Sequence, residues 1–96
     1  MKKSLKEKNS QKITGGQAVV ESLKKEKIKH VFGLIGSATM EIFDSLYREK
    51  EINFIGVRDE RTGTHMADGY ARASNKPGVI LAGQNGPGAT NLVTGI

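Results

Sequence analysis

Cysteine is absent from this chain of 96 residues, so it has neither a disulfide framework nor a zinc site built on cysteine thiolates. Long apolar runs are missing as well. No stretch of about 18 apolar residues could span a membrane, and no apolar segment follows the basic N-terminus as it does in a secretory signal. We therefore predict a soluble, cytoplasmic protein that has no membrane as a partner.

Positive charge is concentrated at one end of the chain. The formal net charge is +5, and residues 1–12 hold +4 of it through five lysines and one glutamate. A lysine-rich end without aromatic residues is typical of a solvated terminus, whereas a nucleic-acid-binding arm is the less common case. We predict that residues 1–12 are a disordered tail, that residues 13–96 are the folded part, and that the protein does not bind nucleic acid.

The length of the chain allows one small domain at most, so any large active site must be shared with other residues. Residues 91–96 have the pattern of a helix without a stop signal. We expect the sequence to be a fragment of a longer protein.

Three short apolar runs have the composition of buried strands, and helical patterns lie before, between and after them. Strands that alternate with helices in this way predict an α/β fold, with a parallel sheet and helices on both of its faces. The three predicted strands occupy residues 30–35, 52–57 and 79–82.

Four helices are expected around these strands. Thr14 and Gln17 have the spacing of a capping box, which predicts a helix that starts there and ends near Lys29. The other helices are predicted after Ser37 as N-cap, over residues 60–73, and after a glycine-rich loop at residues 83–88.

Ligands bind at the carboxyl ends of the strands in parallel sheets, and those ends carry the most unusual local sequences of this chain. They are residues 36–37, 59–60 and 84–88. On residue type alone, the simplest role of Glu60 is a first-turn acid that complements a helix dipole, and that of the glycines is tight turning. A ligand-binding role for these residues stays open at this point.

His65 and Asp68 stand one helical turn apart and are the pair most suited to a metal. A lone histidine with one carboxylate is usually structural, so we expect no metal ligand in this chain. Residues 86–88 could bind an anion at a helix start, but neither a Walker lysine nor a Gly-x-Gly-x-x-Gly pattern accompanies them.

Three longer motifs follow one another in the second half of the chain: His-Met-Ala-Asp-Gly-Tyr-Ala-Arg-Ala at residues 65–73, Lys-Pro-Gly-Val at residues 76–79, and Asn-Gly-Pro-Gly-Ala-Thr-Asn-Leu-Val-Thr-Gly-Ile at residues 85–96. With Val-Phe-Gly-Leu-Ile-Gly at residues 31–36, they resemble the N-terminal pyrimidine-binding domain of thiamine-diphosphate-dependent enzymes. The nearest members are acetolactate synthases, with sulfoacetaldehyde acetyltransferases in the same superfamily. The resemblance implies an incomplete domain of this kind, from a carboligase or decarboxylase of the acetolactate synthase type.

This resemblance implies a catalytic role for Glu60. In the family, a glutamate eight residues before the aspartate of the first motif hydrogen-bonds N1′ of the cofactor's pyrimidine, and Glu60 stands eight residues before Asp68. The bond favours the imino tautomer of the ring, whose 4′-nitrogen then removes the C2 proton of the thiazolium to give the ylid. Glu60 is therefore the residue that the resemblance implies as activating the cofactor.

Two local sequences depart from the family pattern. Arg61 stands where the family usually has glutamine, and residues 35–38 replace its usual Pro-Gly-Gly loop. Residues 35–38 are similar to those of sulfoacetaldehyde acetyltransferases, so formation of acetyl phosphate is the alternative reaction. The residues that the resemblance places around the pyrimidine and the adjoining subunit are Gly36, Ser37, Gly86, Pro87 and Asn91.

The Gly-Asp-Gly motif that holds the diphosphate and Mg²⁺ in this family is absent from these 96 residues. The resemblance places that motif in a separate C-terminal domain, and it implies a homodimer or tetramer that acts on a 2-oxo acid or a sulfoacetaldehyde-like substrate. It leaves open whether FAD is bound. We expect the fragment alone to be inactive, and a non-catalytic ligand-binding or assembly module is the alternative from another class.

Overall fold

The computed structural model describes residues 12–83 and 85–96, so the predicted disordered tail lies, except for Lys12, outside the described residues. Within these ranges no helix is long and apolar enough to cross a membrane. The elements in chain order are α2 (Gly15–Lys25), β1 (His30–Gly33), the 3₁₀ helix η1 (Ser37–Thr39), α3 (Met40–Arg48), β2 (Asn53–Gly56), α4 (Glu60–Ser74), β3 (Val79–Leu81), α5 (Asn85–Asn91) and the 3₁₀ helix η2 (Val93–Gly95).

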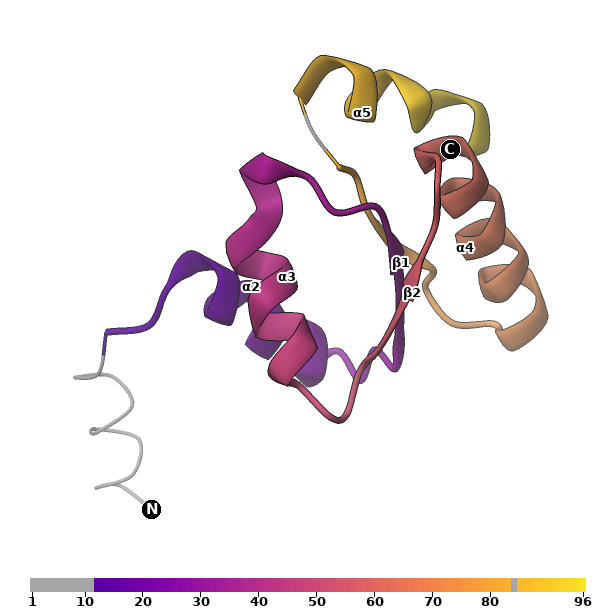
Figure 1. Ribbon diagram of the computed structural model, residues 1–96. Coiled ribbons are helices and arrows are strands. Elements are labelled where there is room, and N and C mark those ends of the chain that lie inside the picture. Colours follow the sequence, from indigo (N-terminus) through magenta and orange to yellow (C-terminus); the bar gives the residue numbers. More distant parts are fainter. Residues whose placement is uncertain (1–11, 84) are drawn as a thin grey trace.

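The three strands form one parallel sheet in the order β2-β1-β3. In its register, Val31 of the central strand lies between Phe54 of β2 and Val79 of β3. Figure 1 shows α2 and α3 on one side of this sheet and α4 and α5 on the other. The predicted parallel sheet with helices on both faces is therefore confirmed.

One hydrophobic cluster fills the space between the sheet and the pair α2 and α3. Val31 points to this side from the centre of the sheet and is fully buried. Phe43 and Phe54 meet edge to face with their ring centroids 5.0 Å apart, a favoured aromatic geometry. The buried members of the cluster are Val20, Ile28, Val31, Phe43, Leu46 and Ile52.

The opposite face of the sheet is covered by α4. Because side chains alternate along a strand, Phe32 points away from the first cluster, and its ring centroid lies 6.1 Å from that of Tyr70 on α4. Small residues let the backbones approach: a Cβ atom on Gly78 would overlap the carbonyl group of Ala67. This close packing sets the distance between α4 and β3, and it thereby sets where the start of α4 lies.

The first helix is shorter than predicted, because it ends at Lys25 instead of near Lys29. Lys27 adopts a left-handed conformation with φ of 59°. Its N–H bonds the carbonyl of Lys24, and the N–H of Ile28 bonds the carbonyl of Leu23, which is the pattern of a Schellman motif. The residue in the left-handed position is lysine and not the usual glycine, so no glycine marks the end of the helix in the sequence.

The predicted N-cap at Ser37 is wrong. Ser37 begins the 3₁₀ helix η1, and the α-helix that follows starts at Met40 without a side-chain cap. The Thr39 hydroxyl instead bonds the carbonyl of Gly36 at 3.2 Å and that of Gly83 at 3.4 Å. Thr39 therefore connects the loop after β1 to the end of β3.

The predicted glycine-rich loop over residues 83–88 is shorter than expected. Helix α5 already begins at Asn85, so the Gly-Pro-Gly segment forms part of its first turn. Proline fits that turn because the first helical N–H groups have no partner within the helix. The helix predicted to run on through residues 91–96 instead ends at Asn91 and is followed by η2.

The capping box predicted at the start of the first helix is confirmed. The N–H of Gln17 donates to Thr14 Oγ1 at 3.1 Å, and the N–H of Thr14 donates to Gln17 Oε1 at 3.0 Å. We predict that Thr14→Ala lowers the free energy of unfolding by about 1 kcal/mol in urea denaturation, whereas Thr14→Ser keeps the cap and the wild-type stability. Equal stability of the alanine and serine variants would contradict this assignment.

Candidate functional site

The carboxyl ends of β1 and β3 lie at the point where the chain switches from adding strands on one side of β1 to adding them on the other. The chain leaves β1 through α3 to reach β2 on one side, and it returns through α4 to place β3 on the other side of β1. In doubly wound sheets, ligands bind in the crevice at such a switch point. The topology of the chain therefore indicates a binding site above the ends of these two strands.

A pocket of about 390 Å³ lies at this position. Its wall comes from the loop after β1, the start of α4, the second residue after β3 and the first turn of α5. Among the described residues of the lining, Glu60 is the only ionisable one, and the others are apolar or glycine. The lining residues are Leu34, Ile35, Gly36, Glu60, Gly83, Pro87 and Gly88.

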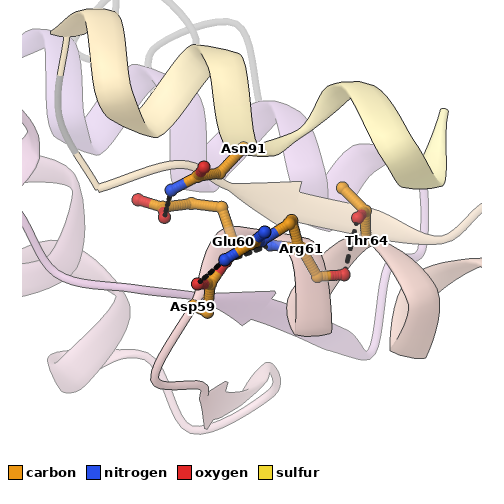
Figure 2. Close-up of polar contacts among 5 residues, drawn as sticks. All are labelled: Asp59, Glu60, Arg61, Thr64 and Asn91. Carbon is orange, nitrogen blue, oxygen red and sulfur yellow. Dashed lines mark hydrogen bonds and ion pairs between the residues drawn. The ribbon is translucent and has the colours of Figure 1, made fainter.

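Glu60 is the first residue of α4 and is only 5% exposed. Its Oε2 accepts a hydrogen bond from the N–H of Gly83 at 3.1 Å, and its Oε1 accepts one from Asn91 Nδ2 at 3.2 Å. Figure 2 shows the side chains of Glu60 and Asn91 pointing toward each other from α4 and α5. The carboxylate therefore joins the end of β3 and two helices.

The residues beside Glu60 fix the start of the helix. Asp59 is the N-cap and accepts the N–H of Arg61 at 2.8 Å. The guanidinium of Arg61 returns to the same carboxylate through Nε at 3.3 Å and Nη2 at 3.1 Å. Since both side chains are partly exposed, the ion pair itself contributes little stability, but it sets a positive charge beside Asp59.

The pKa of Glu60 lies below its ordinary value of 4.5. The largest cause is the hydrogen bond from its own backbone N–H at the start of α4, and the Asn91 amide and the Gly83 N–H act in the same direction. Burial and the negative charge of Asp59 raise the pKa, but the donors outweigh them. Glu60 is therefore ionised at neutral pH although it is buried.

Two glycines leave room for the carboxylate. A Cβ atom on Gly83 would lie 2.9 Å from Glu60 Oε2, and one on Gly88 would lie 3.2 Å from the same atom. Any larger residue at either position would therefore push into the carboxylate group. A third glycine, Gly36, faces Gly83 across the pocket, and a Cβ atom there would overlap the backbone of Gly83.

The structure brings four of the six predicted site residues together. Gly36, Glu60 and Pro87 line the pocket, and Asn91 contacts it through Glu60. Ser37 and Gly86 are not part of the lining: Ser37 is exposed in η1, and Gly86 is exposed in the first turn of α5.

Four residues of the lining were not among those predicted. Leu34 and Ile35 follow β1, Gly83 follows β3, and Gly88 lies in α5. The sequence signal that could have indicated Gly83 is its place directly after a predicted strand. Gly83 contacts Glu60 through its backbone N–H, however, and every residue type except proline has that group, so residue type alone does not reveal the contact.

His65 and Asp68 do not form a site with other ligands. His65 is exposed on α4, and Asp68 accepts a hydrogen bond from Arg72 Nε at 3.0 Å across one turn of the helix. Over residues 12–83 and 85–96, no three side chains of histidine, cysteine, aspartate or glutamate gather in a way that could hold a metal ion.

The geometry of the pocket defines which group it could hold. An ionised carboxylate has about four acceptor positions, and three donors contact that of Glu60: the N–H of Gly83 on Oε2, the Asn91 amide on Oε1 and the N–H of Glu60 itself. An acceptor position therefore remains for a further donor, and walls of glycine and apolar residues suit a flat ring. The residues present fit a heteroaromatic ring that offers an N–H to a carboxylate.

The fold and the pocket define the class of an α/β cofactor-binding domain with a buried carboxylate at the carboxyl edge of its sheet. Comparison with known families agrees with this class. Residues 13–96 match the family described as thiamine pyrophosphate enzyme, N-terminal TPP binding domain. The chain belongs to this family.

Its relatives include several proteins named as acetolactate synthases. The chain is 50% identical over 92 residues to the acetolactate synthase large subunit of Cyanidium caldarium, which covers 93% of the chain and 16% of that protein. It is 46% identical over 85 residues to the large subunit of Haemophilus influenzae, covering 88% of the chain and 15% of that subunit. It is 47% identical over 81 residues to the mitochondrial catalytic subunit of Aspergillus candidus, covering 84% of the chain and 12% of that subunit. The chain thus spans only about one seventh of the length of these relatives.

The depressed pKa of Glu60 predicts how stability changes with pH. The ionised carboxylate stabilises the fold above the pKa that Glu60 has in the unfolded chain, and this stabilisation is lost as the pH falls through the lower pKa of the folded state. We expect the difference in unfolding free energy between wild type and Glu60→Gln to be constant above about pH 5 and to shrink below it. Chemical denaturation at a series of pH values measures this difference, and a difference that grew toward low pH would show a raised pKa instead.

Gly36, which lines the pocket, and Gly86, which does not, are expected to respond in opposite ways to the same substitution. Gly36→Ala places a methyl group on the backbone of Gly83 and is expected to cost about 1–3 kcal/mol or more of unfolding free energy. Gly86→Ala meets nothing within 4 Å and is expected to leave the stability unchanged or slightly raised. Thermal and urea unfolding of the two variants test this, and equal losses would contradict the close approach of the two loops.

Proposed function

We propose that this chain forms the pyrimidine-binding part of a thiamine diphosphate site, in an enzyme of the acetolactate synthase type. Thiamine diphosphate is the TPP of the family name. The observation that carries the proposal is Glu60: a buried, ionised carboxylate in a pocket at the sheet edge, in a chain of this family. Its acceptor positions suit the N1′–H that the pyrimidine carries in its imino or protonated form, the group that a glutamate at this place is expected to bind.

When bound, thiamine diphosphate supplies a carbon nucleophile that attacks the carbonyl of a 2-oxo acid and allows the loss of CO₂. The residues of this chain act around its pyrimidine. Glu60 accepts a hydrogen bond at N1′ and stabilises positive charge there, because an ionised acceptor makes a stronger bond than a neutral one. Leu34, Ile35 and Pro87 supply the apolar surface that keeps water from this contact.

The diphosphate and Mg²⁺ need ligands from outside these residues, since the 96 residues contain no Gly-Asp-Gly motif. We propose that this part of the site comes from another domain, in a homodimer or tetramer, and that pyruvate or a related 2-oxo acid is the substrate. The use of FAD and the cytoplasmic location stay predictions.

Formation of acetyl phosphate from sulfoacetaldehyde is the alternative reaction. It rests on the sequence of residues 35–38, of which Ile35 and Gly36 line the pocket. The relatives named above are acetolactate synthases, so we favour carboligation of a 2-oxo acid. The two reactions differ in their products and are separated by the experiment below. A non-catalytic module is the third possibility, and it predicts no turnover of either substrate.

The experiment places residues 13–96 into the Haemophilus influenzae large subunit in exchange for its matching segment. Acetolactate formed from pyruvate, and acetyl phosphate formed from sulfoacetaldehyde and phosphate, are both measured with thiamine diphosphate and Mg²⁺ present. We expect acetolactate as the product. In this chimaera Glu60→Gln should lower kcat by about 100-fold or more while thiamine diphosphate still binds, because only the charge at N1′ is removed.

Asp59→Asn is the matched control, because it removes the neighbouring charge and keeps a good N-cap. We expect it to keep most of the activity. A chimaera that turns over equally with glutamate or glutamine at position 60 would remove Glu60 from the mechanism. Acetyl phosphate as the product would establish the alternative reaction.

A further inference from the structure

Asn91 lies at the last position of α5 and is partly buried against α4. It was predicted from the resemblance as a cofactor contact, but the contact that the structure shows is with Glu60. An amide that faces an ionised carboxylate must donate through its NH₂ group, because the carboxylate has no proton to give. The direction of this bond is therefore defined.

The placement of Asn91 is held by the segment that follows it. Helix η2 packs against α4, and a Cβ atom on Gly95 would overlap the side chain of Thr64. Thr64 is buried, and its hydroxyl donates to the carbonyl of Arg61 at 2.8 Å in the first turns of α4. The contact between Asn91 and Glu60 thus joins α5 to α4, and the close packing of Gly95 on Thr64 holds the segment after Asn91 against α4.

Within residues 12–83 and 85–96, the charge that acts on Glu60 is that of Asp59, at its own helix start. Residues 31–37 and residues 79–96, which form the other walls, contain no titratable side chain. Asp59 and Arg61 are the charged neighbours along the chain, and they are paired with each other. In the part of the chain that the structure describes, Asn91 is the one side chain that donates to the Glu60 carboxylate.

We propose that Asn91 is a positioning residue: with the N–H of Gly83 on the other oxygen it fixes the plane of the Glu60 carboxylate, so that its remaining acceptor position faces the pocket. The inference rests on the proposed cofactor role of Glu60. A glutamate carboxyl otherwise turns easily about its last torsion. Two donors from different elements, α5 and the end of β3, restrict that rotation before any ligand binds.

The first test is made on the chain itself by NMR, with ¹³C-labelled glutamate carboxyls titrated between about pH 3 and pH 8. Asn91→Asp replaces the donor by an acceptor of nearly the same shape. Two carboxyls so close cannot both ionise readily, and the pair then titrates in two steps. We expect the upper step to lie at least about one pH unit above the titration of Glu60 in the wild type. The amide spectrum shows whether the variant keeps its fold.

Asn91→Ala is the second variant, and it removes the donor without adding charge, so the Glu60 titration should rise by less. Thr90→Ala is the matched control on the same helix: the Thr90 hydroxyl donates only to the carbonyl of Gly86, and Thr90 is exposed. We expect the wild-type titration there. Titration of Glu60 at the same pH in all four proteins would overturn the proposal.

The second test uses the chimaera and follows the dependence of kcat on pH. In Asn91→Asp the acidic limb of the profile should move to higher pH, together with the NMR titration. In Asn91→Ala, kcat should fall more than KM rises, by about tenfold or more, since a loosely held acceptor acts mainly on the chemical step. An unchanged limb in Asn91→Asp would overturn the proposal.

The two proposals fail in different ways. A chimaera that stays active with glutamine at position 60 overturns the proposed function, and the positioning role falls with it even if the NMR titration moves. A chimaera that is inactivated by Glu60→Gln, with a Glu60 titration unaffected by Asn91→Asp, overturns the positioning role alone.

Discussion

The ionised carboxylate of Glu60 is the constraint on which the rest of the site depends. A buried charge is costly unless donors surround it, so the fold must bring N–H groups to both of its oxygens. The N–H of Glu60 itself at the start of α4, the N–H of Gly83 and the amide of Asn91 meet this need. The ends of three elements therefore converge at one point, and the pocket is the space that they leave.

Glycine makes this convergence possible for steric reasons. At Gly36 and Gly83 two loops from neighbouring strands approach so closely that no side chain fits between them, and at Gly88 the helix α5 comes within reach of the carboxylate. Thr39 adds a hydroxyl that bonds the carbonyls of both Gly36 and Gly83. At these three glycines the wall of the pocket has no side chain, so a flat ring can approach the backbone closely there.

Local patterns were sufficient to predict the strands, their parallel pairing and the long helix α4. The strands follow from short apolar runs, their parallel pairing follows from the alternation of strands with helices, and the capping box at Thr14 follows from two residues at a fixed spacing. The end of α2 was not predictable in this way, because Lys27 adopts a conformation that glycine usually marks. The prediction that Ser37 caps the second helix was wrong. The hydroxyl that is engaged there is that of Thr39, which bonds a carbonyl 44 residues away in the chain, and no local pattern indicates such a bond.

The site shows the same division between local and long-range information. Glu60 and Pro87 stand in motifs that sequence can reveal, and both line the pocket. The roles of Gly83 and Asn91 depend on distances between β3, α4 and α5, which arise only when the sheet has formed. A resemblance can indicate that Asn91 belongs to the site, but only the geometry shows that its partner is a side chain of the same chain.

Arg61 illustrates how a departure from the family pattern can be accommodated by this geometry. An aspartate is a good N-cap, but at position 59 it places a second negative charge beside Glu60, which raises the pKa of the buried carboxyl. The guanidinium of Arg61 donates twice to Asp59 and lowers the pKa of that capping carboxyl. The guanidinium thus keeps the capping carboxyl ionised and in place at the start of α4, outside the pocket. A glutamine, the residue usual in the family at this position, carries no charge that could do so. The Asp59 and Arg61 pair thus gives the helix a strong cap while Glu60 stays ionised next to it.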